Sequence, residues 1–129
     1  MKRCIDTCAY SRLMLGHPPL QACMEESTVL VLPVIVLGEL YTGFGAGTRA
    51  AENEGRLESF METPSVRVQD VTVDIARRYA LLVNALRRAG TPLPTNDIWI
   101  AATTLELGAR LLTYDTHFHH IPGLVVEAP

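Results

Sequence analysis

The sequence lacks the features of several common protein classes. No stretch approaches the roughly 18 consecutive apolar residues of a membrane-spanning helix, and the first residues carry no apolar run typical of a signal peptide. The three cysteines, Cys4, Cys8 and Cys23, include no C-x-x-C pair. That number and spacing argue against a disulfide framework and against a zinc site. We therefore expect a cytoplasmic protein, without a membrane partner, whose thiols are reduced and mostly packed.

Lysine is almost absent as well. Lys2 is the single lysine, against ten arginines. A receiver-type phosphorylation domain needs a lysine near its last strands, so this class is excluded. The net charge of −3 at first disfavours a nucleic-acid partner. However, arginine binds phosphate through two parallel hydrogen bonds, and the excess of arginine fits contact with RNA.

The residues that are present suffice for one folded domain. The chain has 129 residues, of which 48% are hydrophobic, enough to form a core. Short β-rich runs alternate with longer helical patterns, which predicts an α/β fold with a parallel sheet. We expect strands at 3–6, 28–32, 66–68, 109–113 and 124–126. Helices are expected at about 9–15, 18–25, 33–42, 49–62, 73–89 and 96–107, with Gly90 and Gly108 ending the last two. No linker or repeat divides residues 1–129.

Four acidic residues lie in apolar surroundings. Asp6 follows Arg-Cys-Ile, Glu39 lies within an apolar helical segment, Asp97 precedes Ile-Trp-Ile-Ala-Ala, and Asp115 follows Leu-Leu-Thr-Tyr. An isolated ionised carboxylate there is costly unless it is paired or binds a metal. Because few cations lie nearby in the sequence, a metal is the leading candidate. Carboxylate oxygens suit Mg²⁺ or Mn²⁺, and displacement at phosphorus is a reaction that such ions assist.

Three of these acids also have ordinary structural interpretations. Asp6 could cap the following helix, Asp115 could form an Asx turn, and Asp97 could favour the start of a helix. Glu39 is expected in the middle of a helix, with Val36, Leu40 and Gly43 on the same side. A solvent-exposed surface role is therefore a poor explanation for this residue. Two strand ends, one helix start and one inward-facing residue together predict a shared site at the carboxyl edge of the sheet.

Polar neighbours of these acids are candidates to orient carboxylates, metal-bound water or a phosphate. They are Thr7, Asn96 and Thr113, for which a cap or turn role is the alternative.

Two other motifs are interpreted as structural. The glycine-rich segment 43–47 follows a helix and lacks the ending of a phosphate loop, so we expect a flexible connector. His117, His119 and His120 lack a second ligand pair at zinc spacing. We expect them to form a polar loop near the site that can touch RNA.

The ordered motifs resemble a known family. They are Ile5-Asp6-Thr7, Gly38-Glu39-Leu40 with Gly43, Asn96 to Ala102, and Leu112 to Phe118 followed by Ile121-Pro122-Gly123-Leu124. This set is similar to PIN-domain ribonucleases, most closely to the VapC toxins of bacterial and archaeal VapBC toxin–antitoxin systems. The resemblance spans nearly the whole chain. It implies a single PIN domain, an α/β/α sandwich around a mostly parallel sheet of about five strands.

The resemblance also implies an activity. It suggests a Mg²⁺-dependent endoribonuclease, with Mn²⁺ as a substitute, whose catalytic residues and metal ligands are Asp6, Glu39, Asp97 and Asp115. Family members cut tRNA, ribosomal RNA or less defined targets, form homodimers and are inhibited by a cognate VapB antitoxin. Many relatives carry Asn where this chain has Cys8, so the family's hydrogen bond at this position is not expected.

A haloacid-dehalogenase-type phosphatase is excluded, because it would need an aspartate at the position of Cys8. Two alternatives to a toxin nuclease remain at this level. A non-catalytic PIN scaffold that binds RNA or protein would carry the same fold. A housekeeping RNA-processing nuclease would carry the same acids.

Overall fold

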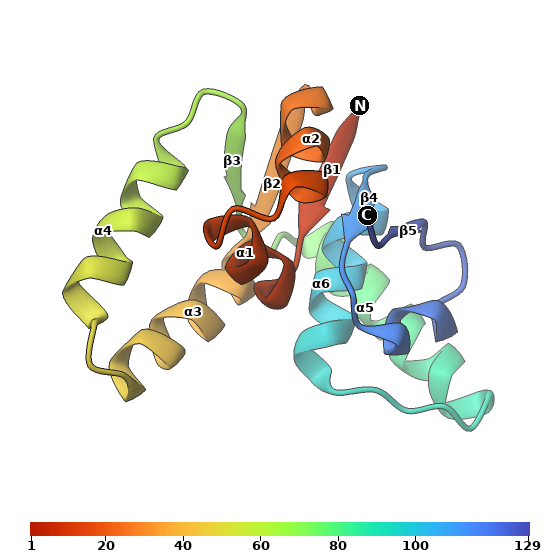
Figure 1. Cartoon of the computed structure of the whole chain (residues 1–129). Coiled ribbons are helices and arrows are strands. Elements are labelled where there is room, and N and C mark those ends of the chain that lie inside the picture. The colour runs from red at the N-terminus through yellow and green to blue at the C-terminus, as the bar shows by residue number, and fades with distance from the viewer.

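A five-stranded parallel sheet forms the centre of the computed structural model, which describes all 129 residues (Figure 1). Its strands are β1 (Lys2–Ile5), β2 (Val29–Pro33), β3 (Val66–Gln69), β4 (Arg110–Leu112) and β5 (Val126–Glu127). Their order is β3-β2-β1-β4-β5, and every neighbouring pair is parallel. The expectation of a parallel sheet of about five strands is confirmed.

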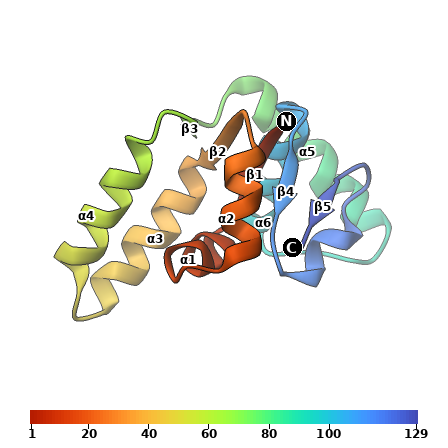
Figure 2. The same cartoon turned by 45° about the horizontal axis from the view of Figure 1, so that its top comes forward.

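Helices cover both faces of this sheet. They are α1 (Thr7–Met14), α2 (Pro18–Glu26), α3 (Val34–Ala46), α4 (Ala50–Met61), α5 (Val73–Arg88) and α6 (Thr95–Glu106), with a short 3₁₀ helix, η1 (Thr116–His120). Helices α1 and α2 lie in front of the sheet in Figure 1, and α5 and α6 lie behind it. Figure 2 shows the same layers with the top of the molecule tilted toward the viewer. The fold is thus the expected α/β/α sandwich. None of its helices combines the length and apolar character needed to cross a membrane.

The central strands are apolar because both of their faces are covered. Ile5, Leu30, Leu32 and Leu111 each expose 0% of their surface. Strands buried on both sides read as continuous apolar runs rather than as alternating patterns. All 28 buried apolar residues form one cluster, so the chain has a single core.

Helix ends follow local capping rules. The Asp6 carboxylate accepts a hydrogen bond from the N–H of Ala9 at 2.8 Å, which caps α1. The hydroxyl of Thr72 caps α5 in the same way. Gly90 and Gly108 follow the ends of α5 and α6 with φ angles of +73° and +62°, a conformation that glycine adopts without a steric penalty. The prediction that they end these helices is confirmed.

We had expected the glycine-rich segment 43–47 to be a flexible connector, and this prediction is wrong. Helix α3 continues through it to Ala46 and ends at Gly47. Glycine costs about 1 kcal/mol relative to alanine within a helix, and tertiary packing offsets this cost. The ring of Phe44 packs against the core and contacts the ring of Tyr41 edge-on, with 6.4 Å between the centroids.

The cysteines are unpaired, as expected from their number and spacing. Cys4 and Cys23 are buried, and burial raises the pKa of Cys4 to about 11. The Cys4 thiol therefore stays protonated at neutral pH and acts as a core residue. Cys8 is exposed on α1.

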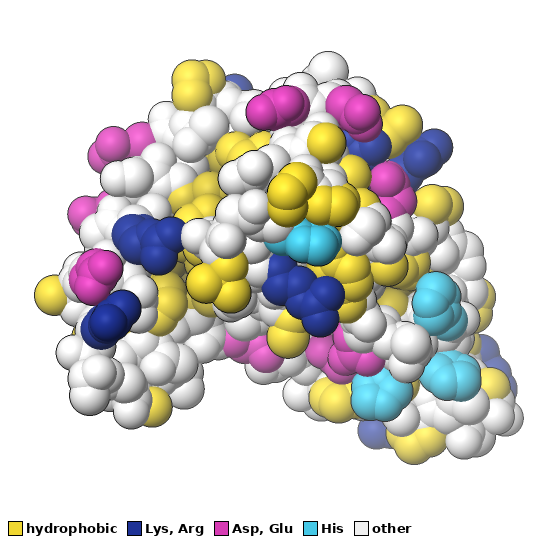
Figure 3. All heavy atoms as spheres, in the orientation of Figure 1, with side chains coloured by type: hydrophobic (Ala, Val, Ile, Leu, Met, Phe, Trp, Pro, Cys, Tyr) yellow, Lys and Arg dark blue, Asp and Glu magenta, His cyan; other side chains and the backbone are white.

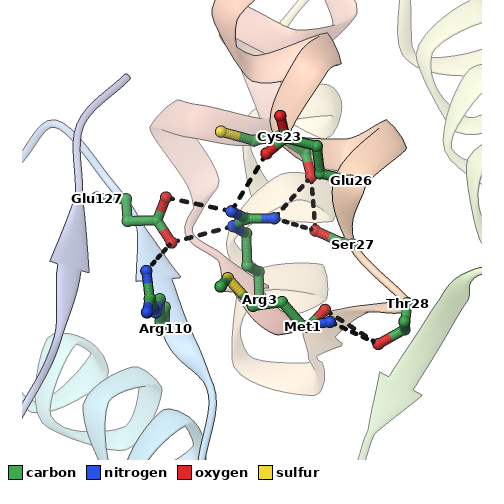
Figure 4. Close-up of polar contacts among 8 residues, drawn as sticks. All are labelled: Met1, Arg3, Cys23, Glu26, Ser27, Thr28, Arg110 and Glu127. Carbon is green, nitrogen blue, oxygen red and sulfur yellow. Dashed lines mark hydrogen bonds and ion pairs between the residues drawn. The ribbon is translucent and has the colours of Figure 1, made fainter.

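A buried arginine links three elements of the fold (Figure 4). Arg3 on β1 is 4% exposed, and its guanidinium donates to both carboxylate oxygens of Glu127 on β5, at 3.0 and 3.4 Å. It also donates to the carbonyl of Cys23 and the hydroxyl of Ser27, near the end of α2. Glu26 lies 3.6 Å away. This arginine thus has a structural role rather than an RNA-binding one.

Candidate active site

The order of the strands places a crevice at the carboxyl ends of β1 and β4. The chain passes from β1 to β2 on one side and later returns to β4 on the other side, with helices on opposite faces. In parallel sheets such a switch point opens a crevice outside the strand ends. The register pairs Ile5 with Leu112, so Asp6 and Thr113, which follow them, are neighbours.

Asp6 lies deepest in the site and uses both carboxylate oxygens. One accepts the capping hydrogen bond from Ala9, and the other accepts the hydroxyl of Thr113. The side chain is buried, and burial raises its pKa. The two hydrogen bonds lower this pKa, while the charges of Asp115 and Glu39 raise it. The capping interpretation of Asp6 therefore holds alongside its place in the site.

Thr113 connects two of the acids. Its hydroxyl donates to Asp6 and accepts the backbone N–H of Asp115 at 3.0 Å. Because Thr113 is completely buried, this contact fixes the chain direction after β4 relative to the end of β1.

Glu39 faces an open cleft rather than the apolar core. Its Oε1 accepts a hydrogen bond of 2.7 Å from the hydroxyl of Thr7, which joins α3 to α1. The cleft has a volume of about 660 Å³ and is also lined by Asn96 from α6 and by Gly38 and Gly43. A Cβ atom at either glycine would meet no atom within 4 Å. Both glycines thus open onto the same cleft as Glu39.

Asp97 and Asp115 come from the other side of the crevice. Asp97 is half-buried in the first turn of α6, and Asp115 caps η1 by accepting the N–H of His117 at 2.9 Å. Burial, followed by the charges of Asp115, Glu39 and Asp6, raises the pKa of Asp97 to about 6, against a smaller lowering by His117. The charges of all three other acids thus act on Asp97.

Burial of the four acids differs from the expectation. Asp6 is buried, whereas Glu39, Asp97 and Asp115 are half-buried at the edge of the crevice. The flanking apolar residues point into the core, while these three side chains reach the surface. Without a bound cation, the free-energy cost of keeping these carboxylates ionised is thus due to mutual repulsion as well as to burial.

No arginine or lysine forms an ion pair with any of the four acids. The neighbouring side chain that can carry a positive charge is His117, whose Nδ1 lies 3.3 Å from Oδ1 of Asp115. Our sequence interpretation missed this contact because it sought paired zinc ligands. The available signal was local: His117 lies two residues after an acid that begins a turn.

Arg12 lies at the rim of the site. Its guanidinium rests 4.0 Å from the ring centroid of Tyr114, and no carboxylate pairs with it. Burial and the nearby acids raise the pKa of Cys8, whereas the charge of Arg12 lowers it, which places Arg12 and the acids around the same thiol. In Figure 3, basic side chains at the centre adjoin acidic ones below them, with histidines to the right over η1.

The side chains fit a divalent cation. Asp97, Asp115 and His117 each offer one ligand atom, and these atoms lie within 4.8 Å of one another. Carboxylate oxygens bind hard cations, and imidazole binds divalent transition metals. A cation would also offset the negative charge that raises the pKa of Asp97.

Comparison with known proteins identifies the family to which this chain belongs. The family model of the PIN domain matches residues 3–124. This chain belongs to the PIN-domain family. Within it, the chain is 34% identical over 95 residues to ribonuclease VapC4 of Mycobacterium tuberculosis, with 72% of each chain covered.

Further relatives extend this likeness over the full fold of the PIN domain. Ribonuclease VapC1 of Haemophilus influenzae strain R2866 is 33% identical over 125 residues, which cover 93% of this chain and 92% of that protein. The structure of VapBC-1 from nontypeable Haemophilus influenzae aligns with a TM-score of 0.84 at 26% identity. The alignment covers 98% of this chain and 97% of that one. The chain therefore belongs to the VapC group of PIN domains, as its motifs had indicated.

Proposed function

We propose that this PIN domain is a metal-dependent endoribonuclease and the toxin of a VapBC-type pair. The observation that carries the proposal is the convergence of four carboxylates, without an arginine or lysine partner, at the switch point between β1 and β4. Relatives named ribonuclease VapC support the same reaction class.

The four acids have distinct positions in the proposed reaction. Asp6, Glu39, Asp97 and Asp115 are the proposed ligands of Mg²⁺ or Mn²⁺, which when bound would activate water and stabilise charge during displacement at phosphorus. The hydroxyl of Thr113 holds Asp6 in place. The four side chains enter from β1, α3, α6 and the segment after β4, so the ligand set requires the folded chain.

Two polar neighbours complete the proposed site. Thr7 donates to one oxygen of Glu39, which leaves the other oxygen free to face the cleft. Asn96 lines the same cleft from α6, and we expect its amide N–H to donate to a phosphate oxygen. Both are positioning residues in this proposal.

Cleavage of RNA by the purified protein tests the proposal. Wild type should cut RNA with Mg²⁺ or Mn²⁺ and lose this activity in EDTA. Asp6→Asn, Glu39→Gln and Asp97→Asn should each abolish cleavage while the protein stays folded by circular dichroism. We expect Asp115→Asn to lower cleavage less than these three variants do. Full activity of Asp97→Asn would refute the four-carboxylate site, and RNA binding without cleavage would favour the scaffold alternative.

A VapB-type antitoxin is the proposed partner. The solved relative from Haemophilus influenzae is a VapBC complex, which supports a pairing of this kind. Expression of the chain alone should arrest growth, and co-expression with the product of an adjacent antitoxin gene should relieve the arrest. Harmless expression of a protein that cleaves RNA well in vitro would instead support a housekeeping nuclease.

Arg12 is the proposed phosphate contact. It is exposed, carries no carboxylate partner and borders the acids. Because the acidic site repels RNA until a cation binds, affinity should rise with Mg²⁺ at matched ionic strength and fall with monovalent salt. Arg12→Ala should weaken binding by about 3–10-fold and reduce the salt slope by about 1. Arg88→Ala, at the exposed end of α5, is the matched control and should have little effect.

The substrate class and oligomeric state complete the proposal. We expect tRNA or ribosomal RNA to be cut at a defined position, which sequencing of the cleaved ends would locate. We also expect a homodimer, which light scattering coupled to gel filtration would measure. A protein that cleaves RNA with full activity as a monomer would contradict the expected homodimer.

A further inference from the structure

His117 is the one histidine of the 117–120 cluster that reaches the acids. Its Nδ1 lies 3.3 Å from Oδ1 of Asp115, and the ligand atoms of Asp97, Asp115 and His117 lie within 4.8 Å of one another. The metal-capable group does not include His119 or His120. The cluster therefore divides into one site residue and two surface residues.

Local structure explains the position of the imidazole. The carboxylate of Asp115 caps η1 by accepting the N–H of His117 at 2.9 Å. This bond holds the backbone of residue 117 against the carboxylate, so its ring extends beside Asp115. The His117 side chain is 60% exposed, so burial of the ring does not account for this placement.

The spacing matches a shared coordination sphere. A six-coordinate ion with ligand bonds of about 2.1 Å separates adjacent ligand atoms by about 3.0 Å and opposite atoms by about 4.2 Å. The 3.3 Å contact between His117 and Asp115 corresponds to adjacent ligands. The ligand atoms of the whole group lie within 4.8 Å of one another, so the closure needed to reach about 4.2 Å is at most about 0.6 Å, and rotation of the side chains can supply it.

A nitrogen ligand changes which cation the site prefers. Mg²⁺ favours oxygen ligands and retains several waters, whereas imidazole suits the divalent transition metals. We propose that His117 is a direct nitrogen ligand of the site and that it directs the site toward Mn²⁺ over Mg²⁺. This inference rests on the proposed metal-dependent function, and it adds a residue outside the four acids.

Pulsed electron paramagnetic resonance of bound Mn²⁺ tests the coordination directly. A coordinated imidazole produces ¹⁴N modulation of the Mn²⁺ echo, which does not depend on RNA cleavage. Wild type should show this modulation, His117→Gln should lose it, and His119→Gln should retain it. His119 is exposed on the same 3₁₀ helix, so it controls for changes to η1 as a whole.

Calorimetric titration with each metal measures the preference. His117→Gln should weaken Mn²⁺ binding by about 10-fold or more, the scale of losses at residues supporting a metal site. Mg²⁺ binding should change less than about 3-fold, so the ratio of the two affinities should fall. His119→Gln should leave both affinities and their ratio unchanged.

The outcomes separate this inference from the proposed function. If Mn²⁺ binds wild type and requires Asp97, but shows no ¹⁴N modulation, the role of His117 is refuted and the carboxylate site stands. An unchanged affinity ratio in His117→Gln would also refute it. If wild type binds neither Mn²⁺ nor Mg²⁺ at millimolar concentration, both the inference and the metal-dependent function fail.

Discussion

Replacing Asp97 by Asn should stabilise the metal-free protein at pH 7. In the folded chain the pKa of Asp97 rises from 3.8 to about 6, through burial and then repulsion by the other acids. At 1.36 kcal/mol per pKa unit, the shift corresponds to at most about 3 kcal/mol, and solvent screening at this half-buried site reduces it to about 1–2 kcal/mol. Loss of the carboxylate from a helix start costs about 0.3–1 kcal/mol. We expect a net gain of about 1 kcal/mol, or about 3–5 °C in Tm.

The gain should depend on pH in one direction. Below about pH 4 the Asp97 carboxyl is protonated in both the folded and the unfolded states, so the variant has no electrostatic advantage. Between pH 4 and 6 the unfolded chain releases its proton first, and wild type loses stability as pH rises. The advantage of Asp97→Asn should therefore grow from pH 4 to 7 and then level off. Thermal melts in EDTA, followed by circular dichroism, measure this trend.

A control variant separates repulsion from the helix-start effect. Asp74 lies in the first turn of α5, is exposed, and its nearest basic partner is Arg77 at 3.9 Å. Asp74→Asn should lower Tm slightly at pH 7, because it loses only favourable interactions. With Mg²⁺ or Mn²⁺ at 100 times Kd, wild type should gain about 2.7 kcal/mol and melt above Asp97→Asn. An Asp97→Asn protein that melts below wild type in EDTA at pH 7 would refute the reasoning.

Two further predictions concern buried polar contacts. Glu127→Gln should destabilise the fold by about 2–4 kcal/mol in urea titrations, because the guanidinium of Arg3 loses its carboxylate in a buried position. Arg110→Gln removes only an exposed partner of the same carboxylate and should cost less than about 1 kcal/mol; equal losses would contradict the burial argument. Thr113→Val should lower RNA cleavage and destabilise the fold by about 1–3 kcal/mol, because it leaves the buried Asp6 oxygen without its donor. Thr113→Ser should restore both, and a Val variant with normal kinetics would contradict the positioning role.

The sheet and the acids at its edge were predictable from local patterns. Apolar runs of strand length predicted all five strands to within two residues at either end, because strands buried on both faces carry continuous apolar sequence. Asp6 and Asp115 could be placed near each other because carboxyl ends of parallel strands share an edge. Their common environment followed from topology, which the βαβ pattern restricts strongly.

Features that depend on packing between distant segments were not predictable. Composition alone suggested a loop at the glycines of α3. The helix extends through them because Phe44 packs against the core. The accessible position of Glu39 depends on the cleft between α3 and α6. The sequence indicated an Asx turn at Asp115, but it did not indicate the 3₁₀ helix η1, on which the contact of His117 with the acids depends.

The buried contact between Arg3 and Glu127 couples the edge of the sheet to its centre. The two residues are 124 positions apart, and they join β5, at the edge of the sheet, to β1, at its centre. Without Glu127 the Arg3 guanidinium keeps Glu26 as its charged partner, at 3.6 Å, and burial of a charge that has lost a partner costs several kcal/mol. Release of β5 from the sheet should therefore loosen β1 as well, and with it Asp6, which follows Arg3 by three residues.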